Sequence, residues 1–501
     1  MTATLTPRKE RQLVQPAPHP YPRRWYTLVV LCLSLLVIVV DGTIVNVALP
    51  TFARDLDAGT TGLQWIVDAY TLTFAALLLL AGAIADRFGR HRALTAGLAI
   101  FGAGSLAAAF TQTTTELIGA RVLMGIGAAF IMPATLSILM NVFPDHVERT
   151  KAIGLWSAVS GLGVAIGPVT GGWLLAHFSW SSIFLVNLPI VAIALVAGHW
   201  LVPASRAAQA RRLDLTGALL SVAAFTALTY TIIEAPTNGW LSGTTLGLAA
   251  ASAALFALFI WREARSDHAM LPLTLFRNPR FTGAAITITV LFFALSGTIF
   301  MSTQIYQFVL GYSPLAAGLR ALPAAAALAV FSPLGASLSK RSGARLPVTL
   351  GLFAVAAGLI FFATATGSSG YGHYVIAMVT VCAGIGLAMS AATSASMKEL
   401  PPALAGVGSA VNDSTRNMGS VLGVAVFGSI SASVFASRMA TAHLKVSSVG
   451  AAAEIAHRTG EAGLLHTAAN AFVSGADQAI IAGVVAAVAG ALIALRTFRT
   501  R

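Results

Sequence analysis

Fourteen apolar runs, each long enough to cross a lipid bilayer, limit the fold of this chain more than any other feature. A membrane-spanning helix needs about 20 mainly apolar residues. Hydrophobic residues make up 56% of the sequence and charged residues 10%, whereas a soluble domain has about 25% charged residues. Because lipid offers no partner to exposed backbone groups, runs of this length predict an all-α integral membrane protein. The expected spans are 26–49, 63–84, 93–110, 116–140, 152–176, 181–201, 215–233, 243–261, 281–306, 314–337, 346–365, 373–397, 404–435 and 476–495.

Basic residues collect in alternate loops between these runs. Short loops rich in Lys and Arg stay on the cytoplasmic side of the membrane. With both ends of the chain in the cytoplasm, nearly all of the 31 Lys and Arg residues fall inside. The exceptions are Arg54, Arg438, Lys445 and Arg458 outside, and Arg121, Arg320 and Arg416 within spans. The net charge of +13 is therefore interpreted as a topology signal and not as a nucleic-acid surface.

The loop after the second run carries the most specific motif. Gly82 and Gly89 bracket Asp86 and Arg87, and Arg90 follows directly. A degenerate copy over 335–345 follows the tenth run. The copy predicts that the last six spans repeat the first six, and that the seventh and eighth spans are an inserted hairpin. Parallel repeats of this kind place a substrate site between the halves, near the midplane of the bilayer.

This repeat divides the chain into units. The expected units are a cytoplasmic tail (1–25), a first six-helix half (26–203), an inserted helix pair (204–262), a cytoplasmic linker (263–280), a second six-helix half (281–495) and a second tail (496–501). The second half includes a long external segment over 437–475.

Charged residues inside predicted spans are costly and are functional candidates by default. Asp41 lies in the first span, about 12 Å from its outer edge at the helical rise, and Asp68 lies nearer the outer edge of the second. The fourth span enters the membrane from outside, so Arg121 lies near its external end and Asp41 is the nearest acid in depth. An ion pair between Arg121 and Asp41 is therefore expected. Asp413 and Arg416 share a face of the thirteenth span, near the bilayer centre, and are expected to pair. The alternatives are an interfacial acid for Asp68 and a structural pair lining a wet cavity for the last two.

Glycines of the fifth span lie on one helix face. Gly163, Gly167 and Gly171 are spaced by four residues, which allows a neighbouring helix to approach closely. Pro168 removes a backbone donor and adds a kink, and Gly172 completes the motif. Generic packing of a Gly-rich membrane helix is the alternative.

Aromatic and amide side chains mark the outer ends of two spans. Trp65, Gln304 and Tyr306 are expected in an aromatic belt, with the lining of an outer pocket as the alternative. Arg320, in the tenth span, has no acid nearby in the sequence. No spacing of His or Cys suits a metal, and the loops contain no nucleotide-binding or nucleophile motif.

These motifs resemble those of the major facilitator superfamily. The loop over 82–90 resembles the superfamily signature between the second and third spans, and 161–172 resembles the fifth-span signature of its drug:proton antiporters. The run over 41–50, together with the number of spans, resembles the fourteen-span branch of those antiporters. The resemblance implies a major facilitator fold of two six-helix halves plus an inserted helix pair.

The resemblance also implies a function: proton-coupled export of amphipathic, cationic drugs by alternating access, in a bacterial cytoplasmic membrane. It gives the acids at positions 41, 68 and 413 roles in proton coupling and cation recognition, and it gives Asp86, Arg87 and Arg90 a gating role. Arg416 beside Asp413 is a departure that leaves recognition to the other two acids.

The expected partners are the lipid bilayer, protons and small cationic substrates, without nucleic acid, for a protein that acts as a monomer. No cofactor is expected beyond the proton motive force. The alternatives are a dedicated exporter of one natural product or siderophore, and a non-transporting membrane receptor or scaffold. An enzyme is not expected.

Overall fold

The computed structural model describes residues 21–206, 214–266, 273–399, 405–441, 446, 448–452, 455 and 462–498. Helices are the only regular secondary structure over these ranges. They include 14 segments long and apolar enough to cross a membrane. The predicted all-α fold with fourteen spans is thus confirmed.

The first half contains seven helices, and the inserted pair follows it. These helices are α1 (Arg24–Asp55), α2 (Thr60–Phe88), α3 (Arg90–Ala109), α4 (Thr114–Val142), α5 (His146–His177), α6 (Ser182–Leu185), α7 (Asn187–Leu201), α8 (Leu215–Asn238) and α9 (Gly243–Arg265). α6 and α7 together make a single span.

The second half follows a short 3-10 helix, η1 (Leu273–Arg277). Its helices are α10 (Pro279–Gln304), the π-helix η2 (Ile305–Val309), α11 (Pro314–Arg320), α12 (Leu322–Ser342), α13 (Arg345–Phe362), α14 (Tyr371–Lys398), α15 (Ala405–Thr441) and α17 (Ala462–Thr497). The single run predicted over 314–337 is broken between α11 and α12. Pro323, in the first turn of α12, lacks the N–H that would continue the hydrogen bonds of α11.

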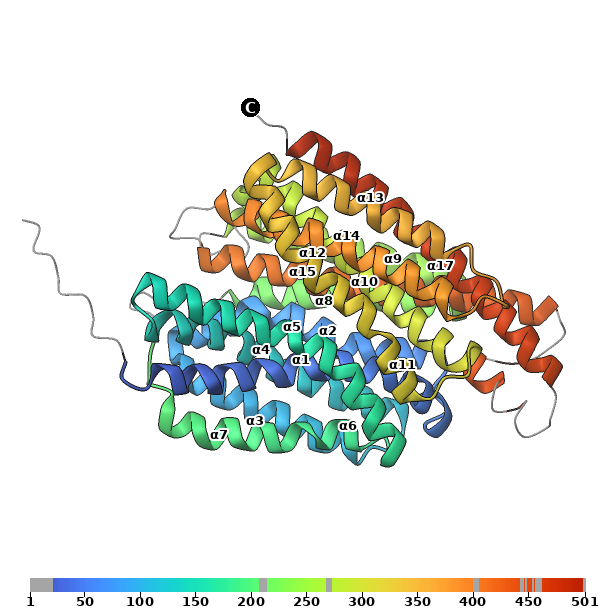
Figure 1. The fold of residues 1–501 in the computed structure, drawn as a ribbon, viewed down its shortest axis with the longest axis horizontal. Helices are drawn as coiled ribbons and strands as arrows, with labels where there is room; N and C mark the ends of the chain where they lie inside the picture. Colours follow the sequence, from blue (N-terminus) through green and yellow to red (C-terminus); the bar gives the residue numbers. More distant parts are fainter. Residues whose placement is uncertain are drawn as a thin grey trace, which may run out of the picture.

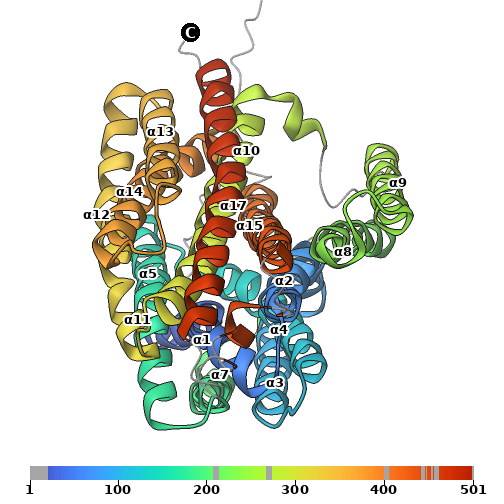
Figure 2. The ribbon, with the colours of Figure 1, turned by 90° about the vertical axis from the view of Figure 1, so that its right-hand side faces the viewer.

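The two halves lie next to each other (Figure 1). Figure 2 shows the inserted pair at their edge, with α8 beside α2 and α15, and α9 outermost. We call the end of the bundle where α1 begins and α17 ends the terminal face. The opposite end, where α1 ends and α17 begins, is the distal face.

Glycine contacts recur in corresponding places of the two halves. A Cβ atom on Gly97 would lie 2.9 Å from the carbonyl oxygen of Gly127, so α3 and α4 approach closely. Gly351 and Gly384 make the same kind of contact between α13 and α14. Glycines of α5 likewise pack on α1, and glycines of α15 pack on α10. This recurrence supports the internal repeat that the copied motif over 335–345 predicts.

Two helices of the second half are longer than predicted. α15 continues to Thr441 and α17 begins at Ala462, whereas the predicted spans are 404–435 and 476–495. Alanine is the strongest helix former, and the alanine-rich flanks extend both helices. Both ends of the external segment expected over 437–475 are therefore helical, and most of its middle lies outside the described residues.

Candidate transport site

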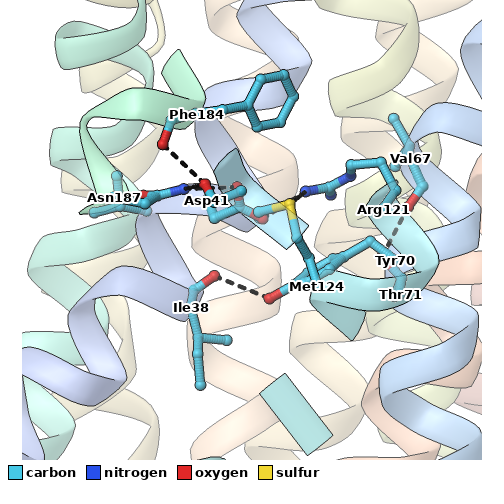
Figure 3. Close-up of polar contacts among 12 residues, drawn as sticks. Ile38, Asp41, Val67, Tyr70, Thr71, Arg121, Met124, Phe184 and Asn187 are labelled. Carbon is cyan, nitrogen blue, oxygen red and sulfur yellow. Dashed lines mark hydrogen bonds and ion pairs between the residues drawn. The ribbon is translucent and has the colours of Figure 1, made fainter. Parts of the chain in front are cut away.

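Asp41 and Arg121 form a buried ion pair between α1 and α4, in the arrangement that the sequence predicts. Arg121 Nη1 donates to Asp41 Oδ2 at 2.5 Å. The exposed fractions of the two side chains are 0% for Asp41 and 1% for Arg121. Each charge offsets the cost of burying the other in the apolar interior. Figure 3 shows the guanidinium reaching the carboxylate from one side.

Asn187, at the start of α7, holds the carboxylate from the other side (Figure 3). Its Nδ2 donates to Asp41 Oδ1 at 3.2 Å and to Ser105 Oγ at 3.1 Å. Both carboxylate oxygens therefore accept a hydrogen bond, which fixes the orientation of the acid. Asn187 is not among the residues that the sequence singles out. An amide in the middle of the sixth apolar span is the signal that points to it.

Tyr70, on α2, holds the guanidinium of Arg121. The guanidinium carbon lies 4.2 Å from the centre of the Tyr70 ring, which is within the range of a cation–π contact. Arg121 Nε also donates to the Ile66 carbonyl oxygen at 3.1 Å, and the Tyr70 hydroxyl donates to the Ile38 carbonyl oxygen at 3.3 Å. The pair therefore ties α1, α2, α4 and α7 together.

Asp68 lies on α2 without a partner. Its side chain is fully buried, and neither carboxylate oxygen has a hydrogen-bond partner within the described chain. Gln64, four residues earlier on the same helix face, donates to the Ala425 carbonyl oxygen of α15 at 2.8 Å. Asp68 thus lies on the face of α2 that meets the second half, shielded from the water that the interfacial interpretation requires.

Asp413 and Arg416 make the expected pair on α15, with 3.7 Å between carboxylate oxygen and guanidinium nitrogen. Their exposed fractions are 18% and 26%, so solvent reaches this pair, in contrast to the sealed pair of the first half. Arg416 Nη2 also donates to Thr393 Oγ1 of α14 at 3.5 Å. α15 begins at Ala405, so Asp413 lies eight residues, or about 12 Å at the helical rise, from the end of the helix at the terminal face.

The glycine face of α5 packs on α1. A Cβ atom on Gly171 would lie 2.6 Å from Ile44 Cγ1, and one on Gly167 would overlap the side chain of Thr43. Gly163 makes the same close approach one turn earlier. Only glycine allows this helix–helix distance. α1, which carries Asp41, is thus held against α5 along its length.

The two halves touch each other near the distal face. Gly172 of α5 packs directly on the start of α11, and Gly318 of α11 meets the carbonyl oxygen of Pro168 at a distance that excludes a side chain. Gln307 Nε2 donates to the Val47 carbonyl oxygen at 2.8 Å. The hydrogen bonds from Gln64 lie toward the same end. The first half and the second half are therefore closed on each other at the distal face.

Residues 31–424 match the family model of the Major Facilitator Superfamily. The chain is 38% identical over 405 residues to the multidrug resistance protein Stp of Mycobacterium tuberculosis, a match that covers 81% of this chain and 75% of that protein. The chain belongs to the Major Facilitator Superfamily. It is accordingly a multi-pass membrane transporter and not an enzyme.

Two further superfamily comparisons cover nearly the whole chain. It is 33% identical over 462 residues to the methyl viologen resistance protein SmvA of Salmonella typhimurium, which covers 92% of each protein. A solved bacterial homologue of the human lysosomal transporter Spinster superposes with a TM-score of 0.69 at 20% identity, covering 95% of this chain and 98% of that one. This structural likeness shows the fold. Superfamily exporters need no cofactor, and no group of three or more His, Cys, Asp or Glu side chains in the described residues could hold a metal.

The superfamily loop between the second and third spans lies at the terminal face. Gly89 adopts φ +115°, a conformation that favours glycine and lets α3 begin directly after α2. Arg90 Nε donates to Asp86 Oδ1 at 2.9 Å, and Arg90 Nη1 donates to the Ser137 carbonyl oxygen of α4 at 3.3 Å. The loop is thus bonded within the first half, and Arg87 is exposed at its surface with its guanidinium carbon 5.6 Å from the centre of the Phe88 ring.

The first glycine of that loop, Gly82, has no close contact that depends on the lack of a side chain. A Cβ atom on Gly82 would lie 3.5 Å from Pro133 Cβ of α4, which is an ordinary van der Waals distance. The contact in this conformation therefore does not require glycine at position 82.

The aromatic belt that the sequence favours is wrong for Gln304 and Tyr306. Both are buried inside the second half, and Tyr306 packs its ring against Tyr371 and Tyr374. Trp65 is half-buried, with its ring against Tyr230 of α8.

Arg320 finds aromatic partners where the sequence shows no acid. Its guanidinium carbon lies 3.8 Å from the ring centre of Tyr312 and 5.4 Å from that of Tyr371. Tyr371 also donates from its hydroxyl to the Arg320 carbonyl oxygen at 3.0 Å. Cation–π contacts stabilise this charge in place of an ion pair.

Proposed function

We propose that this protein exports amphipathic, cationic compounds in exchange for protons by alternating access. The observation that carries the proposal is the contrast between two buried acids of the first half: Asp41 is paired with Arg121, and Asp68 has no partner. An ionised carboxylate without a partner is costly in an apolar interior. Asp68 is therefore the group that holds a proton in this conformation, while Asp41 keeps its charge.

The terminal face is cytoplasmic in this proposal. The basic loop residues Arg87, Arg149, Arg262 and Lys340 lie at that face, and short basic loops stay inside. The halves are then closed on the external side, and the solvent-reached Asp413 and Arg416 open toward the cytoplasm. This arrangement is an inward-facing state, with both chain ends in the cytoplasm of a bacterial cell.

Exchange follows from competition for the unpaired acid. In the inward-facing state, Asp68 releases its proton to the cytoplasm and its carboxylate binds a substrate cation. After the halves rock about the site, a proton from outside takes the carboxylate and the cation leaves. The carboxylate of Asp68 holds either the proton or the substrate cation, so the two move in opposite directions. The paired Asp413 contributes an accessible polar wall and not the binding charge, because Arg416 neutralises it.

Substrate cations of this kind fit the relatives. Methyl viologen, which gives SmvA its name, is an organic dication. In this proposal the two units that rock about the site are the halves with the boundaries derived from the sequence, 26–203 and 281–495. The exposed Arg87 contacts the second half when the cytoplasmic side closes.

Proton release from energised everted vesicles tests the proposal. We expect addition of ethidium or methyl viologen to relieve the quenching of an acridine dye with the wild-type protein and not with Asp68→Asn at equal protein level. Asp55→Asn, which removes an exposed acid at the end of α1, is the matched control and should respond like the wild type. A full response from Asp68→Asn would refute the coupling role of Asp68. A response to one metabolite alone would favour a dedicated exporter.

A further inference from the structure

The inserted helix pair brings an acid of its own to the distal face. Glu234 lies on α8, which ends at Asn238, so its Cα lies about 6 Å below the end of the helix. Its Oε1 accepts a hydrogen bond of 3.4 Å from Trp65 Nε1 of α2. No ion pair found within the described ranges includes Glu234. A long hydrogen bond from a neutral donor leaves most of the charge of this carboxylate uncompensated.

Two aromatic rings that pack on each other lie next to this carboxylate. The ring centroids of Trp65 and Tyr230 lie 6.0 Å apart, with an angle of 45° between the ring planes. Tyr230 and Glu234 are four residues apart on α8 and share the face that meets α2. Tyr230 is 43% exposed, so the group is open on the side of the bundle.

An acid beside two aromatic rings suits an organic cation. Aromatic faces attract cations within about 6 Å of the ring centre. Amphipathic cations collect at the boundary between head groups and acyl chains, which is the depth of this group. We propose that Trp65, Tyr230 and Glu234 form a peripheral binding site for amphipathic organic cations, separate from the site between the two halves.

This peripheral site lies beside the seam where the halves meet. α8 contacts α2 of the first half and α15 of the second half. Trp240 Nε1, just beyond α8, donates to Ser433 Oγ of α15 at 2.9 Å. The seam opens on the external side when a substrate leaves, so the peripheral site receives the departing cation next to the outer leaflet. This last step rests on the proposed function; the cation chemistry of the site does not.

Photoaffinity labelling with an azido derivative of tetraphenylphosphonium tests the site in the full-length protein in lipid nanodiscs. Mass-spectrometric mapping should find adducts on α8 around Tyr230 and on the α2 segment around Trp65. In Glu234→Gln these adducts should fall about tenfold, the equivalent of about 1.4 kcal/mol in affinity. Labelling by a neutral azido-triphenylphosphine oxide should not change.

Two further variants serve as controls. Tyr230→Phe keeps the ring and should keep the adducts, whereas Tyr230→Leu should lose them, which preserves the test if Glu234→Gln does not fold. Asp55→Asn removes an exposed acid at the same face and should leave labelling unchanged. Adducts that are absent from α8, or that do not depend on Glu234 or on the Tyr230 ring, overturn the proposal.

The outcome separates this site from the proposed function. Adducts that depend on Glu234, together with normal proton coupling in Asp68→Asn, would sustain the peripheral site and remove the coupling role of Asp68. Loss of coupling in Asp68→Asn with no adducts on α8 would sustain the transport function and remove the peripheral site.

Discussion

At the scale of single residues, the Asp41–Arg121 pair is a buried charge pair whose two members depend on each other. Both side chains are almost fully buried, and the guanidinium also uses the Tyr70 ring and the Ile66 carbonyl oxygen. Breaking a buried pair by removing one member leaves an uncompensated charge, which costs about 3–5 kcal/mol. Removing both members leaves polar, neutral side chains, which cost much less.

A double-mutant cycle tests whether Asp41 and Arg121 depend on each other. Arg121→Gln should lower the melting temperature of the detergent-purified protein strongly, and adding Asp41→Asn to that variant should restore most of the loss. Transport should be absent from both variants, because neither keeps the ion pair that ties α1, α2, α4 and α7 together. Size-exclusion chromatography of heated samples measures the stability. Equal melting temperatures for Arg121→Gln and the double variant would show that the pair is not coupled.

At the scale of helices, α1 and α5 meet through a surface that admits no side chain. An extra methyl group in a packed interior costs about 1–3 kcal/mol, and the Cβ atom of an alanine at position 167 would overlap Thr43. Gly161 lies on the same helix with nothing within 4 Å of its Cβ position. At such an open position alanine favours the helix by about 1 kcal/mol.

The two glycines therefore predict opposite effects of the same substitution. Gly167→Ala should lower thermal stability and reduce export, because α1 carries Asp41 and must shift. Gly161→Ala should leave export unchanged and keep or raise stability. Melting curves and vesicle export measured side by side check this pair. A stable, active Gly167→Ala would mean that α1 and α5 are less closely packed than this structure shows.

The contacts of the inserted pair with the two halves cannot be predicted from the sequence of the pair alone. α8 meets both halves, through Trp65 of α2 and through Ser433 of α15. In the proposed transport cycle the halves separate at the external side, so the inserted pair cannot keep both contacts throughout the cycle.

At the scale of the whole molecule, hydropathy and charge predict the number of spans and the arrangement of the halves, because each of these depends on local composition. The Asp41–Arg121 pair is predictable from depth alone, since two opposite charges in a membrane interior seek each other. Tyr70 is not, because one phenol in an apolar span has no spacing that marks it. Asn187 is marked only by its amide in the sixth apolar span, which does not reveal that it contacts Asp41. The burial of Tyr306 and the aromatic partners of Arg320 depend on packing between distant helices, and the sequence order of those helices does not reveal it.

Alternating access requires that the contacts between the halves at one face break when the other face closes. Gln64 bridges α2 to the Ala425 carbonyl oxygen and to Ser429 Oγ of α15, at the face proposed to be external. A hydrogen bond contributes about 0.5–1.5 kcal/mol net, so losing this bridge should shift the equilibrium toward the outward-facing state about tenfold. Gln64→Ala should therefore open the external side and close the cytoplasmic side together.

Two cysteine reporters measure both sides in a variant that lacks Cys32 and Cys382. Ser429→Cys is buried under the external contact, and Ser414→Cys lies beside the solvent-reached pair on α15. In the Gln64→Ala background, a membrane-impermeant thiol reagent should label Ser429→Cys faster from outside. The same reagent should label Ser414→Cys more slowly from inside. A cysteine at the exposed Thr237 should react equally in both backgrounds. If the external reporter speeds up and the internal one does not slow down, the bridge only seals the external face locally, and the halves do not move as the two rigid bodies that alternating access requires.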